Sequence, residues 1–426
     1  MGDAHDEHDL FSDDDDDFRT VVDTSFWNQP EVPDYPVLAH FGRFEILGRI
    51  ARGGMAEIYL ARDRDELGKA RHLVVKRVLP EMEDNPDFIA MFLDEGRTAV
   101  RLYHQNVCHV YECGEIDGTT FMALEWVWGP QLQDVIERMS ARDSCIPWPI
   151  AVEILAQVAG ALHYVHHAKG VGGKPLGIVH RDVSPQNVMM SWGGTVKLLD
   201  FGIAKTSGDI TTGGAAVGKY GYMSPEQAQS QHMDQRSDIF ALGIVLYEAL
   251  TGRPLYDRPT LLETLQAIVR EPVPSLRAAR PELPEALEHV VNRALAKDPA
   301  HRFQSAGEMK AALKQVLRTQ GQAVTEQRVA LFLDGLFTDA EKRPLRGKAA
   351  LTGSFQALTE FGTQALAGGG DVTYESFTHE PSDRPPPLAP VEDEPSSPGW
   401  AAWLGLGALA LLMAALGAGL AVFLMR

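Results

Sequence analysis

Five side chains that could take part in chemistry lie in short segments along the middle of this 426-residue chain. Lys76 ends LVVK, Glu95 lies in FLDEGRTA, Asp182 and Asn187 share HRDVSPQN, and Asp200 begins DFG. Carboxylate and carboxamide oxygens are hard ligands suited to Mg²⁺, a carboxylate can accept a proton, and a lysine supplies a fixed cation. Residues of these types are suited to holding a divalent cation beside an anionic group.

Further short motifs stand before and after these segments in one continuous order. A glycine-containing turn, LGRIARGGMAEIY, occupies Leu47 to Tyr59, and glycine allows backbone N–H groups to approach a phosphate because no Cβ intervenes. Ser224-Pro225-Glu226, Asp238 in RSDIFALG and Arg302 in KDPAHRF follow Asp200. Each motif alone is weak, but the ordered set is specific.

This ordered set, from roughly Phe44 to Leu317, resembles the signature of protein kinases, specifically bacterial Ser/Thr kinases of the eukaryotic (Hanks) type. The resemblance implies transfer of the γ-phosphate of ATP to Ser or Thr hydroxyls of protein substrates, with Mg²⁺ or Mn²⁺. Phosphoryl transfer depends mainly on positioning and on neutralising charge, which is the chemistry that these residue types supply.

The resemblance also assigns roles to single residues. Lys76 is expected to bind the α- and β-phosphates, Glu95 to hold Lys76, and Asp182 to accept the proton of the substrate hydroxyl, while Asn187 and Asp200 bind the metal. Leu124 is the expected gatekeeper and Glu125 to Val127 the hinge that pairs with adenine. The predicted ATP-binding residues are Ile50, Ala51, Arg52, Gly53, Gly54, Met55, Ala56, Ile58, Lys76, Leu124, Glu125 and Val127. Asp238 and the Glu226–Arg302 pair are expected to stabilise the helical lobe.

The chain departs from the family pattern at three places. In the glycine loop, two family glycines are Ala51 and Ala56, and Gly54 restores some freedom at the tip. The lysine two residues after the catalytic aspartate is Ser184, and the threonine of the activation segment is Lys219. One interpretation is that a hydroxyl and an ammonium have exchanged places, so that Lys219 supplies the cation near the γ-phosphate. The alternative is that the two changes are unrelated and Lys219 faces solvent.

Phosphorylation in the activation segment is a further expectation. Arg181 precedes Asp182, as in kinases that respond to a phosphate in this segment, and Thr211 and Thr212 are the candidate acceptors. A phosphate there would add about −1.5 to −2 charge and could pair with Arg181. The alternative is that the Gly-rich stretch is simply mobile.

The pattern of elements predicts an α+β, bilobal kinase fold. An alternating stretch from Phe44 to Leu60 predicts a β-hairpin, and strands are expected at 73–78, 108–113 and 120–127. Helical periodicity begins near Ile150 and continues at 311–317 and 328–336. The expected domains are the kinase domain at 44–317 and a helical C-terminal extension at 318–365.

Charge and composition set off the two ends of the chain. The net charge of −19 argues against nucleic acid as a partner, and residues 1–36 contain twelve acids and one base, which predicts a disordered tail. The tail is interpreted as a solubilising leader, an autoinhibitor lying on the basic substrate groove, or the working part of a scaffold. Residues 366–399 are rich in Pro, Gly and acid and read as a linker. Three cysteines without metal-like spacing fit a reducing compartment.

An uncharged apolar segment at 401–425 predicts a single transmembrane helix, since 25 residues span about 37 Å and a bilayer core needs about 30 Å. Trp400, Trp403 and Arg426 suit its edges. The expected location is the cell (inner) membrane, single-pass, with the kinase domain in the cytoplasm and, because nothing follows Arg426, no ectodomain. Small residues at Ala410, Ala414 and Ala418 allow a homodimer through this helix, although an alanine-rich composition alone gives the same spacing.

Two functions of other classes remain open at this stage. One is a pseudokinase that binds nucleotide or partners without phosphotransfer, and the other is a membrane scaffold. Retention of Lys76, Asp182, Asn187 and Asp200 favours the active enzyme, whereas the altered loop and Ser184 favour the pseudokinase. The substrates and the input signal do not follow from the sequence.

Overall fold

A computed structural model of the protein describes residues 35–64, 69–200 and 217–343, and the side chains of Val171 and of residues 217–219 lie outside that description. The predictions made for almost all of the acidic tail, for Thr211 and Thr212, for the linker and for the membrane segment therefore fall outside the described residues.

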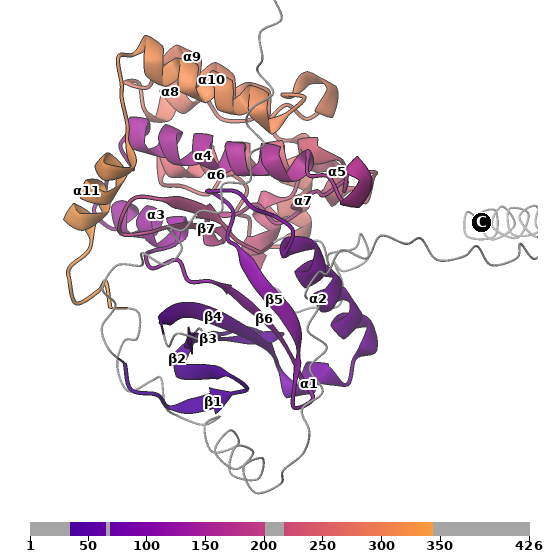
Figure 1. Ribbon diagram of the computed structural model, residues 1–426. Helices are drawn as coiled ribbons and strands as arrows, with labels where there is room; N and C mark the ends of the chain where they lie inside the picture. Colours follow the sequence, from indigo (N-terminus) through magenta and orange to yellow (C-terminus); the bar gives the residue numbers. More distant parts are fainter. Residues whose placement is uncertain (1–34, 65–68, 201–216, 344–426) are drawn as a thin grey trace, which may run out of the picture. The chain divides into compact units, whose positions relative to one another are not determined.

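The N-terminal lobe is built on one antiparallel sheet of six strands in the order β1-β2-β3-β4-β6-β5 (Figure 1). The strands are β1 Ala39–Phe41, β2 Phe44–Arg52, β3 Ala56–Arg64, β4 Ala70–Val78, β5 Val110–Ile116 and β6 Thr119–Glu125. Alternation of apolar residues buries one face, where the rings of Phe41 and Phe44 meet Phe121 edge to face, with centroids 5.5 and 5.7 Å away. The predicted hairpin is confirmed as β2 and β3.

Helix α2 (Pro86–Ala99) follows the short α1 (Pro80–Glu83) and packs on β5. It begins at Asn85, whose side chain accepts a hydrogen bond from the N–H of Phe88, and Pro86 suits the first helical position. Gly96 allows the close approach, because a Cβ there would lie 2.6 Å from Cβ of Cys113. The glycine therefore sets how near Glu95, its neighbour, lies to the sheet.

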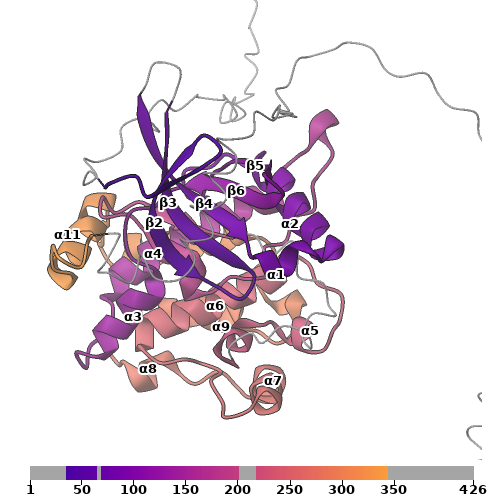
Figure 2. The same ribbon diagram turned by 90° about the horizontal axis from the view of Figure 1, so that it is seen from below.

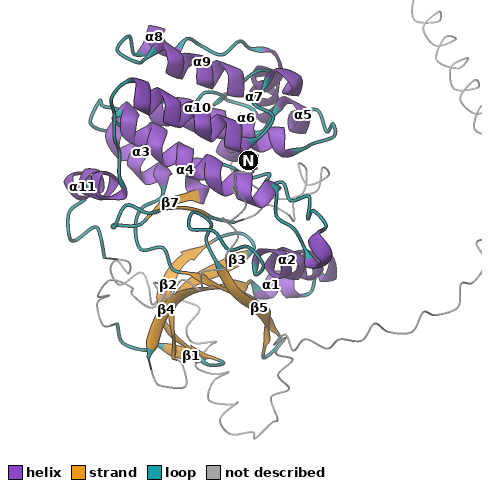
Figure 3. Ribbon diagram, turned by 45° about the horizontal axis from the view of Figure 1, so that its top comes forward, coloured by secondary structure: helices purple, strands orange, loops and turns teal. Residues whose placement is uncertain are grey.

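The C-terminal lobe is helical, and Figures 2 and 3 show its helices on one side of the sheet, with α11 at the edge. Its elements are α3 Leu132–Ser140, α4 Trp148–His166, β7 Val188–Met190, β8 Val196–Leu198, α5 Pro225–Ala228, α6 Gln235–Thr251, α7 Leu261–Arg270, α8 Leu276–Ala279, α9 Glu285–Ala294, α10 Ala306–Thr319 and α11 Glu326–Leu336. Helices α4 and α6 carry apolar residues on all sides, and nearly all of their residues are buried inside the lobe. Within the described residues α4 alone is long and apolar enough to cross a membrane, and most of it is buried in the lobe.

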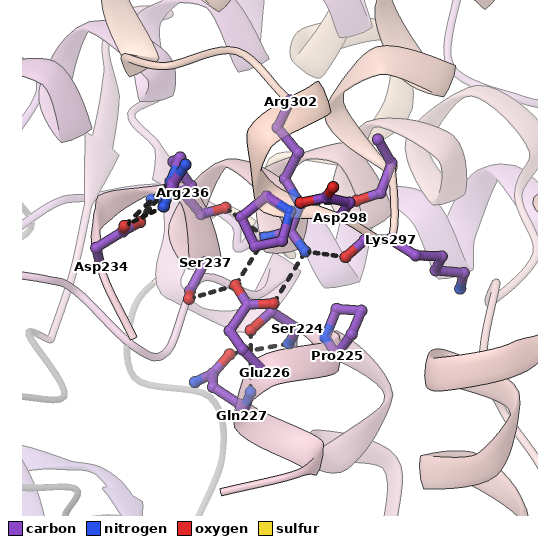
Figure 4. A network of polar contacts seen from close by, with 12 residues as sticks. Ser224, Pro225, Glu226, Gln227, Asp234, Arg236, Ser237, Lys297, Asp298 and Arg302 are labelled. Carbon is purple, nitrogen blue, oxygen red and sulfur yellow. Dashed lines mark hydrogen bonds and ion pairs between the residues drawn. The ribbon is translucent and has the colours of Figure 1, made fainter. Parts of the chain in front are cut away.

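The predicted Glu226–Arg302 pair is confirmed as a buried, bidentate ion pair (Figure 4). Nη1 and Nη2 of Arg302 donate to the two carboxylate oxygens of Glu226 at 2.7 and 2.9 Å. The Ser237 hydroxyl donates to the same carboxylate at 2.6 Å. The ion pair therefore connects α5 to the segment before α10, and the bond from Ser237 connects both to the first turn of α6.

Candidate active site

A cavity of about 1180 Å³ opens between the sheet and the helical lobe. Eight of the twelve predicted ATP-binding residues line it, namely Ile50, Ala51, Arg52, Ile58, Lys76, Leu124, Glu125 and Val127. Asp200 also lines it. The other four predicted residues, Gly53, Gly54, Met55 and Ala56, form the tip of the hairpin beyond the cavity lining in the described structure.

The hairpin tip is a tight turn open to solvent. The N–H of Gly53 donates to the carbonyl of Ala56 at 2.9 Å, and the carbonyl of Met55 accepts from the N–H of Leu79 at 3.0 Å. A Cβ added to Gly54 would meet no atom within 4 Å. Ala51, one of the departures from the family pattern, lies within β2 and pairs with Ile58 of β3. Its Cβ is therefore accommodated in the sheet.

Lys76 lies near the centre of the sheet, opposite Ile58 on one side and Met122 on the other. Its Nζ donates to Oδ1 of Asp200 at 3.1 Å, a link between the two lobes. Burial opposes the charged form of Lys76, but the carboxylates of Asp200 and Glu95 outweigh it and raise its pKa. Asp200 is thus the hydrogen-bond partner of Lys76 in this structure, and the role predicted for Glu95, that it holds Lys76 in place, stays a prediction.

The segment from His180 to Asn187 is held from behind by Asp238. The carboxylate of Asp238 accepts hydrogen bonds from the backbone N–H groups of His180 and Arg181, at 2.8 Å each. One of its oxygens lies 2.7 Å from Nε2 of His166. These bonds fix Arg181 at a φ of 64°, a conformation that non-glycine residues adopt rarely. The turn that presents Asp182 therefore depends on Asp238, as expected of a residue that stabilises this lobe.

Asp182 and Asn187 lie side by side at the end of this segment. Nδ2 of Asn187 donates to the carbonyl of Asp182 at 2.7 Å and to its Oδ2 at 3.1 Å. The carbonyl of Asn187 accepts the N–H of Leu199 at 2.8 Å, which places Asp200 next to it with a φ of 42°. Contacts therefore connect Asp182 to Asn187, Asn187 to the residue before Asp200, and Asp200 to Lys76, and of these four Lys76 and Asp200 line the cavity. Their roles stay predictions.

The donor set suits Mg²⁺. With its amide nitrogen bonded to Asp182, Asn187 has Oδ1 available to a cation, and the partly exposed Asp200 carboxylate lines the cavity. No group of three or more His, Cys, Asp and Glu side chains in the described residues could hold a metal by itself. Mg²⁺ is commonly held by one or two protein oxygens together with substrate phosphates, so an incomplete protein shell is consistent with such a site.

The predicted hinge connects the two lobes along the back of the cavity. The N–H of Glu125 donates to the carbonyl of His109 at 2.7 Å, and its carboxylate accepts from Nζ of Lys197 at 2.8 Å. Among the described backbone groups, none bonds the peptide N–H or carbonyl of Val127, which lines the cavity. Val127 therefore offers one donor and one acceptor to a planar base.

Of the two side chains in the exchange hypothesis, the structure describes only that of Ser184, and the hypothesis stays a prediction. Ser184 is buried, and its hydroxyl has no hydrogen-bond partner among the described residues. The backbone of Lys219 lies in a 3₁₀ turn, Val217–Tyr222, but its side chain is outside the description. The cation at Lys219 stays a prediction.

Sequence reasoning missed one wall of the cavity. Residues of the hinge, of the segments after it and of the C-terminal extension also line the cavity, namely Trp126, Trp128, Arg138, Arg142, Trp192, Phe337, Glu341, Lys342 and Arg343. The helical pattern at 328–336 predicted α11, but nothing in the sequence placed it beside the cleft. Trp126, within the predicted hinge, and Trp128, directly after it, were the available signal that an aromatic surface lies there.

Comparisons with known proteins agree with this geometry. A model of the protein kinase domain matches residues 44–317. The tyrosine-protein kinase MasK of Myxococcus xanthus is 35% identical over 373 residues, covering 85% of this chain and 58% of MasK. A match of that extent passes residue 317 and includes residues 326–343. The serine/threonine-protein kinase PknB of Mycolicibacterium smegmatis is 36% identical over 310 residues, covering 70% of this chain and 45% of PknB.

The chain spans about half the length of the curated relatives it matches. Among solved structures, a crystal structure of the PknI kinase domain of Mycobacterium tuberculosis has a TM-score of 0.51 and 28% identity, covering 67% of this chain and all of that one. The expected bilobal architecture, with a β-rich and a helical lobe, is confirmed.

Proposed function

This chain belongs to the protein kinase family, and on that premise we propose that it is a protein kinase that transfers the γ-phosphate of ATP to hydroxyl groups of proteins, those of serine and threonine first. The observation that carries the proposal is the set of contacts at this cavity: Lys76 and Asp200 line it and bond each other, and Asn187, bonded to the residue before Asp200, also bonds Asp182. A pseudokinase would be expected to lack one of these side chains.

In this proposal each side chain has a role that its geometry allows. Lys76, kept charged by Asp200 and Glu95, binds the α- and β-phosphates, and Val127 bonds the adenine. Asp182, held by Asn187, accepts or orients the proton of the substrate hydroxyl. Asn187 and Asp200 would hold Mg²⁺ or Mn²⁺, which neutralises charge on the phosphates when bound.

A tyrosine acceptor is the second candidate. The first relative described above is named a tyrosine-protein kinase, and the lysine that Ser/Thr kinases carry two residues after the catalytic aspartate is Ser184 here. Against it, PknB is named a serine/threonine kinase and is equally similar over a shorter match. The acceptor residue of the product distinguishes the two.

Regulation and location extend the proposal. Autophosphorylation at Thr211 or Thr212 would add a phosphate that could pair with Arg181. The apolar residues 401–425 would anchor the protein in the cell membrane with the kinase domain in the cytoplasm, where ATP is available. Pairing of such helices through Ala410, Ala414 and Ala418 would raise the local concentration of one kinase domain around another.

The direct test uses the purified full-length chain in detergent with [γ-³²P]ATP, Mg²⁺ and a general acceptor such as casein or myelin basic protein. We expect label in the chain itself and in the acceptor, and mass spectrometry should find phosphoserine or phosphothreonine. Phosphotyrosine alone would select the second candidate. Nucleotide binding without any transfer would select the pseudokinase.

A further inference from the structure

The C-terminal extension is anchored beside the hinge by a close backbone contact. We call residues 326–343, which comprise α11 and the segment after it, the hinge strap. Gly194, in the turn between β7 and β8, has a φ of 90°, and a Cβ there would lie 1.9 Å from the carbonyl oxygen of Glu326. A side chain at position 194 is therefore incompatible with the strap in this place.

The end of the strap is bonded to the residue that follows the hinge. Nε1 of Trp128 donates to the carbonyl of Lys342 at 2.7 Å. The indole also stacks on Trp126, with ring centroids 5.7 Å apart and planes 19° apart, and the carbonyl of Trp128 accepts the N–H of Trp192 at 3.0 Å. Trp128 is thereby held on both sides, one residue from Val127, whose backbone groups have no partner among the described backbone groups.

A second set of contacts joins the strap to α3. Arg138 donates to both carboxylate oxygens of Glu341, and its guanidinium lies 4.4 Å from the centre of the Phe337 ring. Arg142 donates to the carbonyl of Leu336 at 3.1 Å. The hydrogen bond from Arg138, with those from the backbone and hydroxyl of Thr338, lowers the pKa of Glu341 to about 2, so this carboxylate is charged at neutral pH.

The strap also lines the cavity that contains Lys76 and Val127. Phe337, Glu341, Lys342 and Arg343 line the same cavity as Lys76 and Val127. Phe337 packs edge to face on Trp192, with centroids 5.4 Å apart. The wall is therefore continuous from the strap to the hinge.

We propose that the hinge strap is a positioning element for the nucleotide: by fixing Trp128 and α3 it holds Val127 in the geometry that binds adenine. The inference rests on the proposed use of ATP in this cleft. Because the strap's contacts with Trp128, Arg138 and Arg142 lie beside the hinge and α3, its release should weaken nucleotide binding more than it slows the transfer step.

Three single variants of the full-length chain remove the strap contacts separately: Glu341→Gln, Trp128→Phe and Gly194→Ala. We expect each to raise the KM for ATP about tenfold, with a smaller change in kcat, and to weaken the Kd of a fluorescent ATP analogue by the same factor. Glu341→Gln and Arg138→Met should be non-additive when combined, since they remove one interaction.

Two matched variants serve as controls. Glu285→Gln removes an exposed charge on α9, and Gly118→Ala places a Cβ on a residue with a φ of 74° where no atom lies within 4 Å. Both should keep the wild-type KM. If Gly194→Ala fails to fold, Glu341→Gln and Trp128→Phe still decide the matter.

Wild-type KM and Kd in Glu341→Gln and Trp128→Phe would overturn the inference. The inference would also be overturned if each variant lowered the melting temperature and reduced kcat by the same factor as it raised KM, since that pattern indicates a structural role alone. Absence of transfer in the wild-type protein would instead contradict the proposed function, while the Kd measurement would still report on the strap.

Discussion

At the scale of the residue, the cleft relies on a few charges whose neighbours keep them in place. Asp238 holds the backbone of Arg181, Asn187 holds Asp182, and Asp200 bonds Lys76 across the lobes. The resemblance of the ordered motifs to those of protein kinases predicted all of these residues. It did not predict the bond between Lys76 and Asp200 in this structure, since the two residues are 124 positions apart in the chain.

The exchange hypothesis predicts coupling between Ser184 and Lys219. Lys219→Thr alone should lose most of the phosphotransfer rate, because the cation near the γ-phosphate is removed. Ser184→Lys combined with Lys219→Thr should recover much of it, and a double-mutant cycle on kcat/KM measures the coupling. Simple additivity of the two effects would show that the two positions are independent.

At the scale of the element, the sequence predicted the longer strands and the long central helices, but it missed the three-residue strands β1, β7 and β8 and placed boundaries less well. The strand expected at 108–113 lies at Val110–Ile116, because Asp117 and Gly118, both with positive φ, form the turn that ends it. The strand expected to reach Val127 ends at Glu125, where the hinge leaves the sheet. Short amphipathic helices such as α3 and α7 were missed because their apolar stripe is only two or three turns long.

Loss of the buried Arg302–Glu226 pair should greatly lower the free energy of unfolding of the helical lobe. Arg302→Met leaves the Glu226 carboxylate buried without its partner, and we expect a loss of about 3–5 kcal/mol in the free energy of unfolding. Arg97→Met, which breaks an exposed pair with Asp94 on α2, should cost under about 1 kcal/mol. Urea unfolding measures both, and equal effects would refute the structural role.

The same pair predicts a pH dependence of stability. Burial alone would raise the pKa of Glu226, but hydrogen bonds from Arg302 and Ser237 outweigh it and lower the pKa below its ordinary value of 4.5. A lowered carboxyl pKa contributes stability that is fully present above pH 4.5 and is lost as the pH falls through the folded-state value. Between neutral pH and pH 4, the melting temperature of Glu226→Gln should therefore fall less than that of the wild type. An identical slope would contradict this account.

At the scale of the whole molecule, the extension after the kinase domain is the part that sequence reasoning could not place. Its helix was predicted, but Trp128 and Lys342 are 214 residues apart, and Arg138 and Glu341 are 203 apart. Contacts of that range arise from the tertiary fold and leave no local pattern. The acidic tail, the linker and the apolar segment at 401–425 lie outside the described residues, so their roles stay proposals.

The membrane proposal predicts a change in location on truncation. A chain ending at residue 399 should appear in the soluble fraction of cells that make it, whereas the full chain should sediment with membranes and resist extraction by alkaline carbonate. Kinase activity in detergent should be similar for both forms. Recovery of the full chain in the soluble fraction would contradict the anchor.

The measurement that tests the central claim most directly is the phosphotransfer rate of Asp182→Asn against wild type under saturating ATP and Mg²⁺. We predict a loss of about 10²–10⁴-fold in kcat with an unchanged melting temperature, because Asn keeps the size of the side chain but accepts no proton. Asp117→Asn, in the β5–β6 turn with a φ of 50°, is the matched control and should keep the full rate. An Asp182→Asn protein that phosphorylates itself and its acceptor at the wild-type rate would contradict the assignment of this cleft as the active site.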